Sequence, residues 1–314
     1  KKKKIIKLEY SSQVDLENIS LNLGFSSLKN YFSNYNNSIL LKNNSIKLQY
    51  KNKNLNVKGE SDYSFGTFFD KVEYKINKKK DNYDFLTLIN FDNNPIKIKL
   101  INYSKEKNKK SNLKLKGSYN KSKVKFNEIT YNEDQNFFEL KDLIFNNNFK
   151  IVDLNKIKVD YLNENNIKNE FTIKKDLTYY NLSGKSFDSY DLINNILLSD
   201  SDESFLDNFN LKDETVLNIN LNKVLLDKEN SSKNLYGKLT IKNNKVHNLN
   251  LTSVFDNNKK FELDVKTLKN NQKITSFYSD NAEPFVKHYK FIKGFKEGKI
   301  DFYSVKENKV SNST

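Results

Sequence analysis

Hydrophobic and polar residues alternate along most of the chain from residue 45 onward. Ile46 and Leu48 alternate with Lys and Gln, Leu113 and Leu115 alternate with Lys, and Leu263 lies between Glu and Asp. A period of two is typical of a β-strand with one apolar and one polar face. The pattern therefore predicts a mainly β protein built as a long antiparallel meander. Clusters of Asn, Asp, Ser and Lys, which suit turns, separate the strands at 78–82, 92–94, 105–111 and 163–166.

Helical spacing of apolar residues is confined to two or three short segments. One covers residues 16–35, a second begins at the capping residues Asp188 or Ser189, and a third follows Asp280 and ends at Gly294. The change of pattern near residue 188 predicts an N-terminal β-meander region, 1–188, and a second β region with two short helices, 189–314. In the second region the strands are expected at 216–226, 235–242, 245–255, 260–268, 273–279 and 298–305.

A weak repeat of the form apolar-x-apolar-x-Gly ends at Gly59, Gly117 and Gly184. Glycine at the end of a strand usually accompanies a bulge or a sharp bend. We therefore expect local irregularities of the sheet at these three positions.

A sheet with one apolar face must cover that face. With so few helices, either two sheets close as an elongated sandwich, or one sheet curls into a trough whose lining is left for an apolar guest. The trough has an energetic rationale, because exposing a 16-carbon acyl chain to water costs on the order of 12 kcal/mol at about 0.8 kcal/mol per methylene. The side chains expected to line such a groove are those of Ile46, Leu48, Ile96, Ile98, Leu113, Leu115, Leu263 and Val265.

The composition changes how the charge is interpreted. The chain has 314 residues and a formal net charge of +15, and all of its 54 basic residues are Lys. A-and-T-rich codons specify the abundant Lys, Asn, Ile, Phe and Tyr, so the charge reflects nucleotide bias. A nucleic-acid surface would favour the bidentate guanidinium of Arg, and we expect no nucleic-acid partner. The lysine-dense stretch 105–125 is interpreted as a solvated sheet face, with contact to anionic lipid head groups as the alternative.

Candidate catalytic and metal-binding residues are few. Cys is absent, and His247 and His288 are the only histidines. His247 alternates in phase with Leu249, which predicts a half-buried strand position. The acidic residues near Asp200 lack the Gly and the ligand spacing of a calcium loop. We expect no enzymatic activity, no cofactor and no metal.

The residues around 180–198 carry a family resemblance. The segment 180–188, YNLSGKSFD, followed by the Leu-rich stretch 191–198, resembles a junction of the AsmA-like family, in its YhdP-type branch. Asp280 with Ala282, and Gly298 before a strand, are similar to later positions of that family, although Asn281 is inserted and Glu297 replaces a glycine. The residues that match its structural positions are Gly184, Phe187, Asp188, Asp280 and Gly298.

This resemblance implies a non-enzymatic protein of the Gram-negative envelope. Its β-rich body would lie in the periplasm, attached to the inner membrane by an anchor upstream of this chain, and its apolar groove would support phospholipid movement toward the outer membrane. No apolar run in the chain approaches the roughly 20 residues that span a bilayer, and the lack of Met suggests a fragment. The partner would be a phospholipid or other acyl-chain lipid. The alternative is a structural or surface-exposed β-sandwich binding protein without lipid cargo.

Overall fold

The computed structural model describes residues 8–22, 26–190, 214–226, 229–243, 245–256, 258–270, 272–286 and 297–307. Its strands form one mixed sheet of 18 strands and a separate two-stranded ribbon, so the prediction of a mainly β protein is confirmed. The chain forms two compact units, residues 1–166 and 167–314, and each is described by itself. The boundary drawn at residue 188 from the change of pattern stays a prediction.

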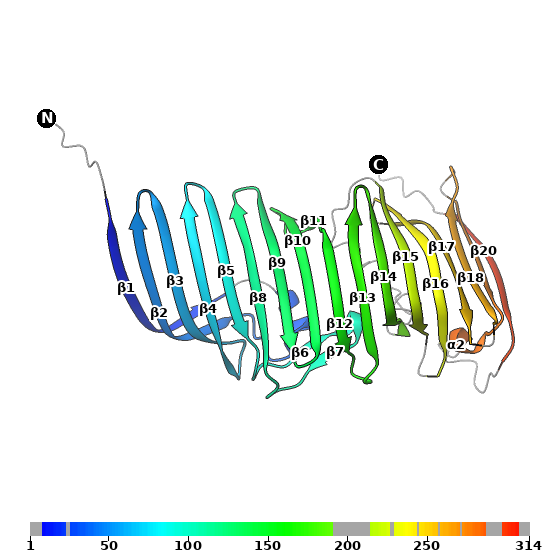
Figure 1. Cartoon of the computed structure of the whole chain (residues 1–314), viewed down its shortest axis with the longest axis horizontal. Coiled ribbons are helices and arrows are strands. Elements are labelled where there is room, and N and C mark those ends of the chain that lie inside the picture. The colour runs from blue at the N-terminus through cyan, green and yellow to red at the C-terminus, as the bar shows by residue number, and fades with distance from the viewer. Residues whose placement is uncertain are drawn as a thin grey trace. The chain divides into compact units, whose positions relative to one another are not determined.

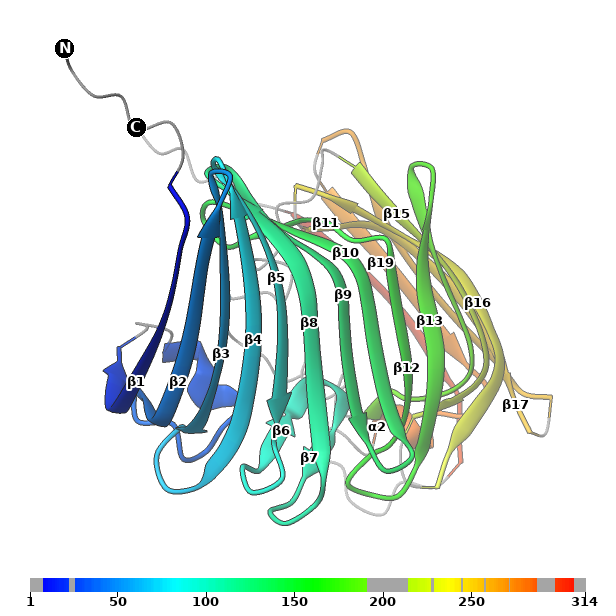
Figure 2. The ribbon, with the colours of Figure 1, turned by 60° about the vertical axis from the view of Figure 1, so that its left-hand side comes forward.

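The first unit is an antiparallel meander in which each strand pairs with the next main strand along the chain. In Figures 1 and 2 its strands form one layer, and η1 and the β6–β7 ribbon lie at one end of that layer. The main strands are β1 (Tyr10–Leu21), β2 (Ile39–Lys51), β3 (Asn54–Ser64), β4 (Phe69–Lys79), β5 (Asn82–Asn90), β8 (Ser111–Asn120), β9 (Lys123–Glu133), β10 (Asn136–Asn146) and β12 (Lys156–Leu162). The shorter elements are the 3-10 helices η1 (Ser26–Asn30) and η2 (Lys99–Ile101) and the strands β6 (Ile96–Ile98), β7 (Tyr103–Lys105) and β11 (Ile151–Asp153).

The predicted helix at residues 16–35 is wrong where the structure describes it. Residues 16–21 belong to β1, and only η1 has helical turns. Antiparallel pairing with β2, which sets Val14 opposite Ile46 and Ile19 opposite Leu41, overrides the helical spacing. Pairing along an open sheet edge satisfies the backbone N–H and C=O groups of β1 that face β2. The predicted turns at 78–82, 92–94, 105–111 and 163–166 do separate or end strands.

In its described residues, the second unit contains eight strands and one helical turn. They are β13 (Lys168–Asp176), β14 (Tyr179–Asp188), β15 (Glu214–Leu225), β16 (Ser231–Lys242), β17 (Lys245–Phe255), β18 (Lys260–Thr267), β19 (Gln272–Ser279), α2 (Glu283–Val286) and β20 (Ile300–Glu307). The six strands expected after residue 215 are confirmed within a few residues. The expectation of a purely antiparallel meander is wrong at one place, because β14 and β15 pair in parallel over nine positions. The residues that connect them, 191–213, lie outside the described residues.

The helices predicted in this unit are only partly testable. Asp188 Oδ1 accepts a hydrogen bond from the Tyr190 N–H at 3.1 Å, as a capping residue does, but the rest of that helix lies outside the described residues. The helix after Asp280 begins as α2, with Pro284 in its first turn. Its remaining residues, including His288 and Gly294, also lie outside the described residues.

The three repeat glycines lie inside strands rather than at strand ends. Gly59 is opposite Tyr74 in the β3–β4 register, and Gly184 is opposite Phe171. A Cβ on Gly59 would overlap the Tyr74 ring, and one on Gly117 would meet Phe85 and the backbone of β9. The expected register irregularities are present near Gly117 and Gly184, but the expectation is wrong at Gly59, whose pairings with Ile46 and Tyr74 are regular. Each glycine therefore leaves space for a neighbouring strand, in two cases for an aromatic ring over the backbone.

We predict that Gly59→Val destabilises the first unit by about 1–3 kcal/mol, because the added side chain occupies the space of the Tyr74 ring. Urea unfolding followed by circular dichroism measures the change. In a Tyr74→Ala background the same substitution should cost far less, since valine suits a strand better than glycine. Equal costs in the two backgrounds would show that the ring is not the cause.

Candidate functional site

The sheet of the first unit has an apolar face made of rows that cross its strands. Register pairs share a face, so Ile46 connects through Gly59, Tyr74 and Thr87 to Leu115. A neighbouring row contains Leu48, Val57, Ile76 and Phe85, and a third contains Val72, Ile89 and Leu113. Apart from Gly59 and Thr87, these rows consist of apolar or aromatic side chains, and all their members are half-buried.

Four of the expected groove residues therefore lie on one face of the first unit: Ile46, Leu48, Leu113 and Leu115. Ile96 and Ile98 are not in the main sheet, because they form β6 of the small ribbon with β7. Ile96 is buried, with 9% of its surface exposed. β6 and β7 have three residues each and are separated by a tight 3-10 turn, so they pair with each other instead of extending the meander. The alternation of residues 96–100 does not predict this pairing.

The same arrangement occurs within the second unit. Leu263 lies between Leu251 and Phe277, and Val265 lies between Leu249 and Thr275. Leu263 and Val265 are half-buried. Both expected groove residues of this unit thus share one apolar face.

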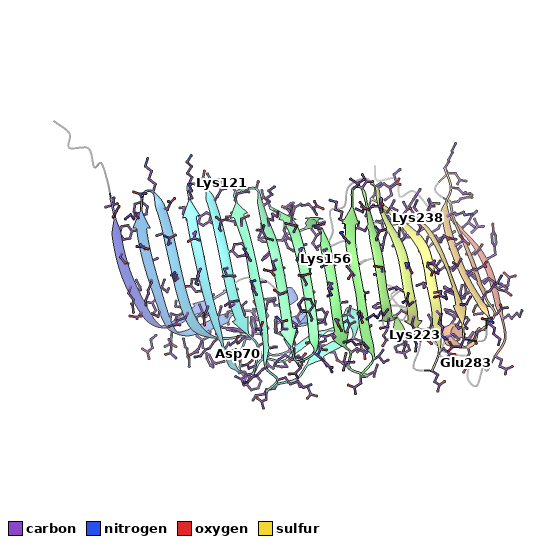
Figure 3. The ribbon with its side chains drawn as sticks, viewed as in Figure 1. Asp70, Lys121, Lys156, Lys223, Lys238 and Glu283 are labelled. Carbon is purple, nitrogen blue, oxygen red and sulfur yellow. The ribbon has the colours of Figure 1, made fainter. Side chains whose placement is uncertain are left out.

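The apolar face of the first unit is buried at one end. Asp70, near the beginning of β4, marks this end in Figure 3, and Lys121, in the β8–β9 turn, marks the opposite end. Phe32 stacks on Phe65 and on Phe91, with ring centroids 4.3 and 5.6 Å apart. A second aromatic group surrounds Tyr103 and consists of Tyr131, Phe138 and Tyr161. These contacts attach η1 and the β6–β7 ribbon to the end of the face.

A buried polar group holds the ribbon in place. Tyr103, 1% exposed, donates a hydrogen bond from its hydroxyl to Glu133, which is 2% exposed. Asn136 donates to the same Glu133 carboxylate at 2.9 Å. Lys105 is also buried, and its ammonium donates to the backbone carbonyls of Asp92, Asn94 and Glu106 at 3.0–3.3 Å. Burial lowers the pKa of Lys105, and its carbonyl partners are what an ammonium deprived of water requires.

Sequence reasoning missed this group. Lys105 belongs to a run of lysines whose other members are exposed, and nothing in the run distinguishes it. The one available signal was that Tyr103 and Lys105 flank a single residue in a short strand, so they share a face. The side chains of this group make their hydrogen bonds to other protein groups, which suits a structural role.

In the second unit the apolar face is buried around α2. Leu221, Val224, Leu226, Phe255 and Phe261 form the buried core. Phe285 of α2 stacks on Phe261, with ring centroids 5.4 Å apart, and meets Phe277 edge-on at 4.8 Å. The first turn of the predicted helix therefore covers one part of this face.

The residues singled out by the family resemblance lie at junctions of this unit. Phe187 packs edge-on against Phe171, and the Asp188 N–H donates to Asn169 at 2.7 Å. The Asp280 carboxylate accepts hydrogen bonds from the Lys260 N–H at 2.9 Å and from the Tyr278 hydroxyl at 2.6 Å, and it pairs with Lys299 at 2.8 Å.

The Lys299 ammonium and these hydrogen bonds hold the pKa of Asp280 well below its usual range. Gly298, with a positive φ of 87°, accepts the Ala282 N–H. Gly184 lies beside a register irregularity of β13 and β14. The contacts of all five residues therefore suit a structural role.

Other chemistry has little support in the described ranges. His247 is half-buried on β17, as its alternation predicts. No group of three or more His, Asp or Glu side chains in the described part is arranged to hold a metal ion. Asp200 and its acidic neighbours lie outside that part. Among the described helices, none combines the length and apolarity needed to cross a bilayer.

Comparisons with known proteins add no relative. The chain matches no protein-family model, and no curated protein or solved structure was found to be similar to it. Function is therefore argued from the two faces of the sheet.

The buried tyrosines predict a loss of stability at alkaline pH. Burial raises the pKa values of Tyr63 and Tyr103 far above the ordinary 10.0 and that of Tyr131 to about 12. The folded chain keeps these protons at pH values where the unfolded chain releases them. The contribution of each tyrosine to the free energy of unfolding is thus complete below pH 10. Above pH 10 it declines by about 1.4 kcal/mol per pH unit.

Tyr103→Phe should lower stability at pH 7 by about 1–3 kcal/mol, because Glu133 loses a hydrogen-bond donor, and should make the alkaline decline less steep. Urea unfolding between pH 7 and 11.5 measures both effects. Values above pH 10.5, the ordinary pKa of lysine, decide the slope, because burial lowers the pKa of Lys105 from that value. Tyr119→Phe, an exposed tyrosine of β8, is the control. An unchanged slope in Tyr103→Phe would contradict the prediction.

Proposed function

We propose that this chain is a non-enzymatic lipid carrier that holds the acyl chain of a phospholipid or related lipid against the apolar face of its sheet. The observation behind the proposal is the half-buried state of that face in the middle of the strands. Rows containing Ile46, Leu48, Leu113 and Leu115 are continuous, apolar and incompletely covered. A sheet that packed only to form a core would bury such rows as completely as the end around Tyr103.

The energetics favour an elongated apolar guest. A row of side chains crosses neighbouring strands at about 4.8 Å per strand, so it presents a continuous apolar track rather than a compact cavity. An acyl chain of 16 carbons on such a track avoids a penalty on the order of 12 kcal/mol in water. We further propose that the apolar face forms a trough.

The cellular setting belongs to the same proposal. Location in the periplasm, attachment to the inner membrane and transport toward the outer membrane rest on the resemblance of residues 180–198 to AsmA-like proteins. The structural contacts of Phe187, Asp188 and Asp280 are compatible with the non-catalytic roles that the resemblance implies.

The direct test is photo-crosslinking at two adjacent positions of β8. A photoreactive phenylalanine analogue replaces either Leu115, on the apolar face, or Lys116, on the opposite face. After purification from cells, mass spectrometry should find lipid adducts at position 115 and not at position 116. Equal labelling at the two positions, or none at either, would refute carriage on this face and favour a binding protein without lipid cargo.

A charge placed on the apolar face should remove the lipid. Leu113→Asp with Leu115→Asp is expected to reduce co-purified lipid at least tenfold, because a carboxylate beside an acyl chain loses its hydration. Asn112→Asp with Ser118→Asp adds the same charge to the other face of the same strand and is the control. The two Asp substitutions are able to unfold the sheet, so a milder variant is needed. Leu113→Thr with Leu115→Thr keeps strand propensity, and it must show a smaller loss of lipid with a normal circular dichroism spectrum.

A further inference from the structure

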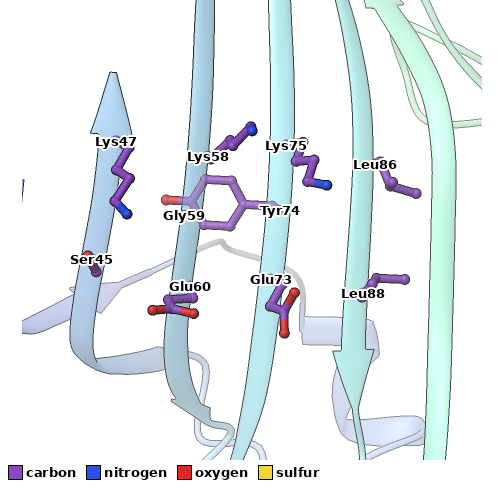
Figure 4. A pocket seen from close by; sticks show the side chains of 10 residues that line it. All are labelled: Ser45, Lys47, Lys58, Gly59, Glu60, Glu73, Tyr74, Lys75, Leu86 and Leu88. Carbon is purple, nitrogen blue, oxygen red and sulfur yellow. The ribbon is translucent and has the colours of Figure 1, made fainter. Parts of the chain in front are cut away.

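The polar face of the first unit contains a hollow of about 250 Å³ on β2–β5. Figure 4 shows that Lys47, Lys58 and Lys75 extend along one side of it, one from each of three neighbouring strands. Glu60 and Glu73 lie on the other side. This face is opposite to the one proposed to carry lipid, so the hollow does not depend on that proposal.

The register sets like charges directly opposite each other. Lys58 pairs with both Lys47 and Lys75, and Glu60 pairs with Glu73. Like charges at directly opposed positions destabilise a sheet, whereas opposite charges stabilise it. In this hollow the cations form one row and the carboxylates the next, about 7 Å away along the strands.

Elsewhere on the same face several lysines have carboxylate partners. Lys141 and Lys156 both pair with Glu139, at 3.2 and 2.8 Å, and Lys114 pairs with Glu128 at 2.8 Å. Lys47, Lys58 and Lys75 make no ion pair with any described carboxylate. Their charges are therefore available to a ligand.

The remaining walls restrict the kind of ligand. Leu86 is opposite Lys75, and Leu88, 42% exposed, is opposite Glu73. They are apolar side chains beside the charged rows. Gly59 lies between Lys58 and Glu60 on β3 and also lines the hollow. The hollow thus offers a cationic side, an anionic side and an apolar edge.

We infer that this hollow binds a phosphate ester that carries an ammonium group on a short alkyl linker. Three ammonium groups against two carboxylates give the site a net charge of +1, which complements an aminoalkyl phosphate monoester of net charge near −1. The three lysines bind the phosphate, the two glutamates bind the ammonium, and the leucines contact the linker. A simple anion, or a flat anionic membrane, leaves the two glutamates without a cationic partner and therefore binds more weakly.

Calorimetric titration of the full chain tests the site with three soluble probes: O-phosphoethanolamine, inorganic phosphate and ethanolamine. O-Phosphoethanolamine should bind with one-to-one stoichiometry and at least tenfold more tightly than either of the other probes. Equal affinity for phosphate, or no binding of O-phosphoethanolamine, would overturn the inference.

Paired variants identify the role of each row. Lys58→Gln with Lys75→Gln should weaken O-phosphoethanolamine binding at least tenfold. Glu60→Gln with Glu73→Gln should weaken it as well but strengthen binding of phosphate, because the repulsion is gone. Lys79→Gln with Lys123→Gln removes the same charge from exposed positions outside the hollow and should change nothing. An unchanged affinity in the first pair would place the ligand elsewhere.

Vesicle flotation separates the two sources of this chemistry. If vesicles containing phosphatidylethanolamine bind the chain, and the Lys58→Gln with Lys75→Gln variant does not bind, the ligand is a lipid head group. If the chain binds O-phosphoethanolamine but not these vesicles, the ligand is a free metabolite. Preferential capture by phosphatidylglycerol vesicles, which carry no ammonium, would overturn the inference.

Discussion

The structure depends on one constraint, which is that successive side chains of a strand point to opposite faces of the sheet. The alternation gathers Leu, Ile, Val and Phe on one face and Lys, Glu and Asn on the other. A one-sided apolar surface must be covered by protein or by a partner. In the first unit η1 and the β6–β7 ribbon cover one end, and in the second unit α2 covers part of the face. The remaining rows are half-buried, and this incomplete cover is the property from which the function is argued.

The sequence predicted what depends on local pattern and missed what depends on distant pairing. The alternation in residues 245–279 and the polar clusters between strands were sufficient to place most strands and turns of the second unit. Residues 16–21 have helical spacing, yet β2 offers them an unpaired edge, and their partners on that edge lie 18 to 28 residues away in the sequence. The parallel pairing of β14 with β15 likewise depends on a crossover rather than on either strand's own residues. Both misses follow from tertiary contacts overriding local propensity.

The candidate sites divide in the same way. Leu113 and Leu115 were assigned to one face from their spacing alone, and the register places them with Ile46 and Leu48. Ile96 and Ile98 have the same spacing but form a separate ribbon, so alternation identifies a strand without identifying its sheet. The hollow on the polar face was beyond sequence reasoning. It exists because β2, β3 and β4 align three lysines, and the register of three strands cannot be derived from one strand at a time.

The lysines show why position is more informative than composition in this chain. Nucleotide bias supplies lysine everywhere, so the net charge of +15 says little about partners. The structure separates lysines of equal chemistry into distinct environments: Lys105 is buried among carbonyls, Lys141 and Lys156 share a glutamate, and Lys58 faces two further lysines. Random placement explains exposed lysines and even paired ones, because a mobile side chain finds a carboxylate at little cost. Opposed lysines also occur as single pairs elsewhere, for example Lys223 opposite Lys233. Around the hollow, however, a row of three lysines adjoins a row of two glutamates, and a single exchange between Lys58 and Glu60 would set opposite charges against each other in the β3–β4 pair.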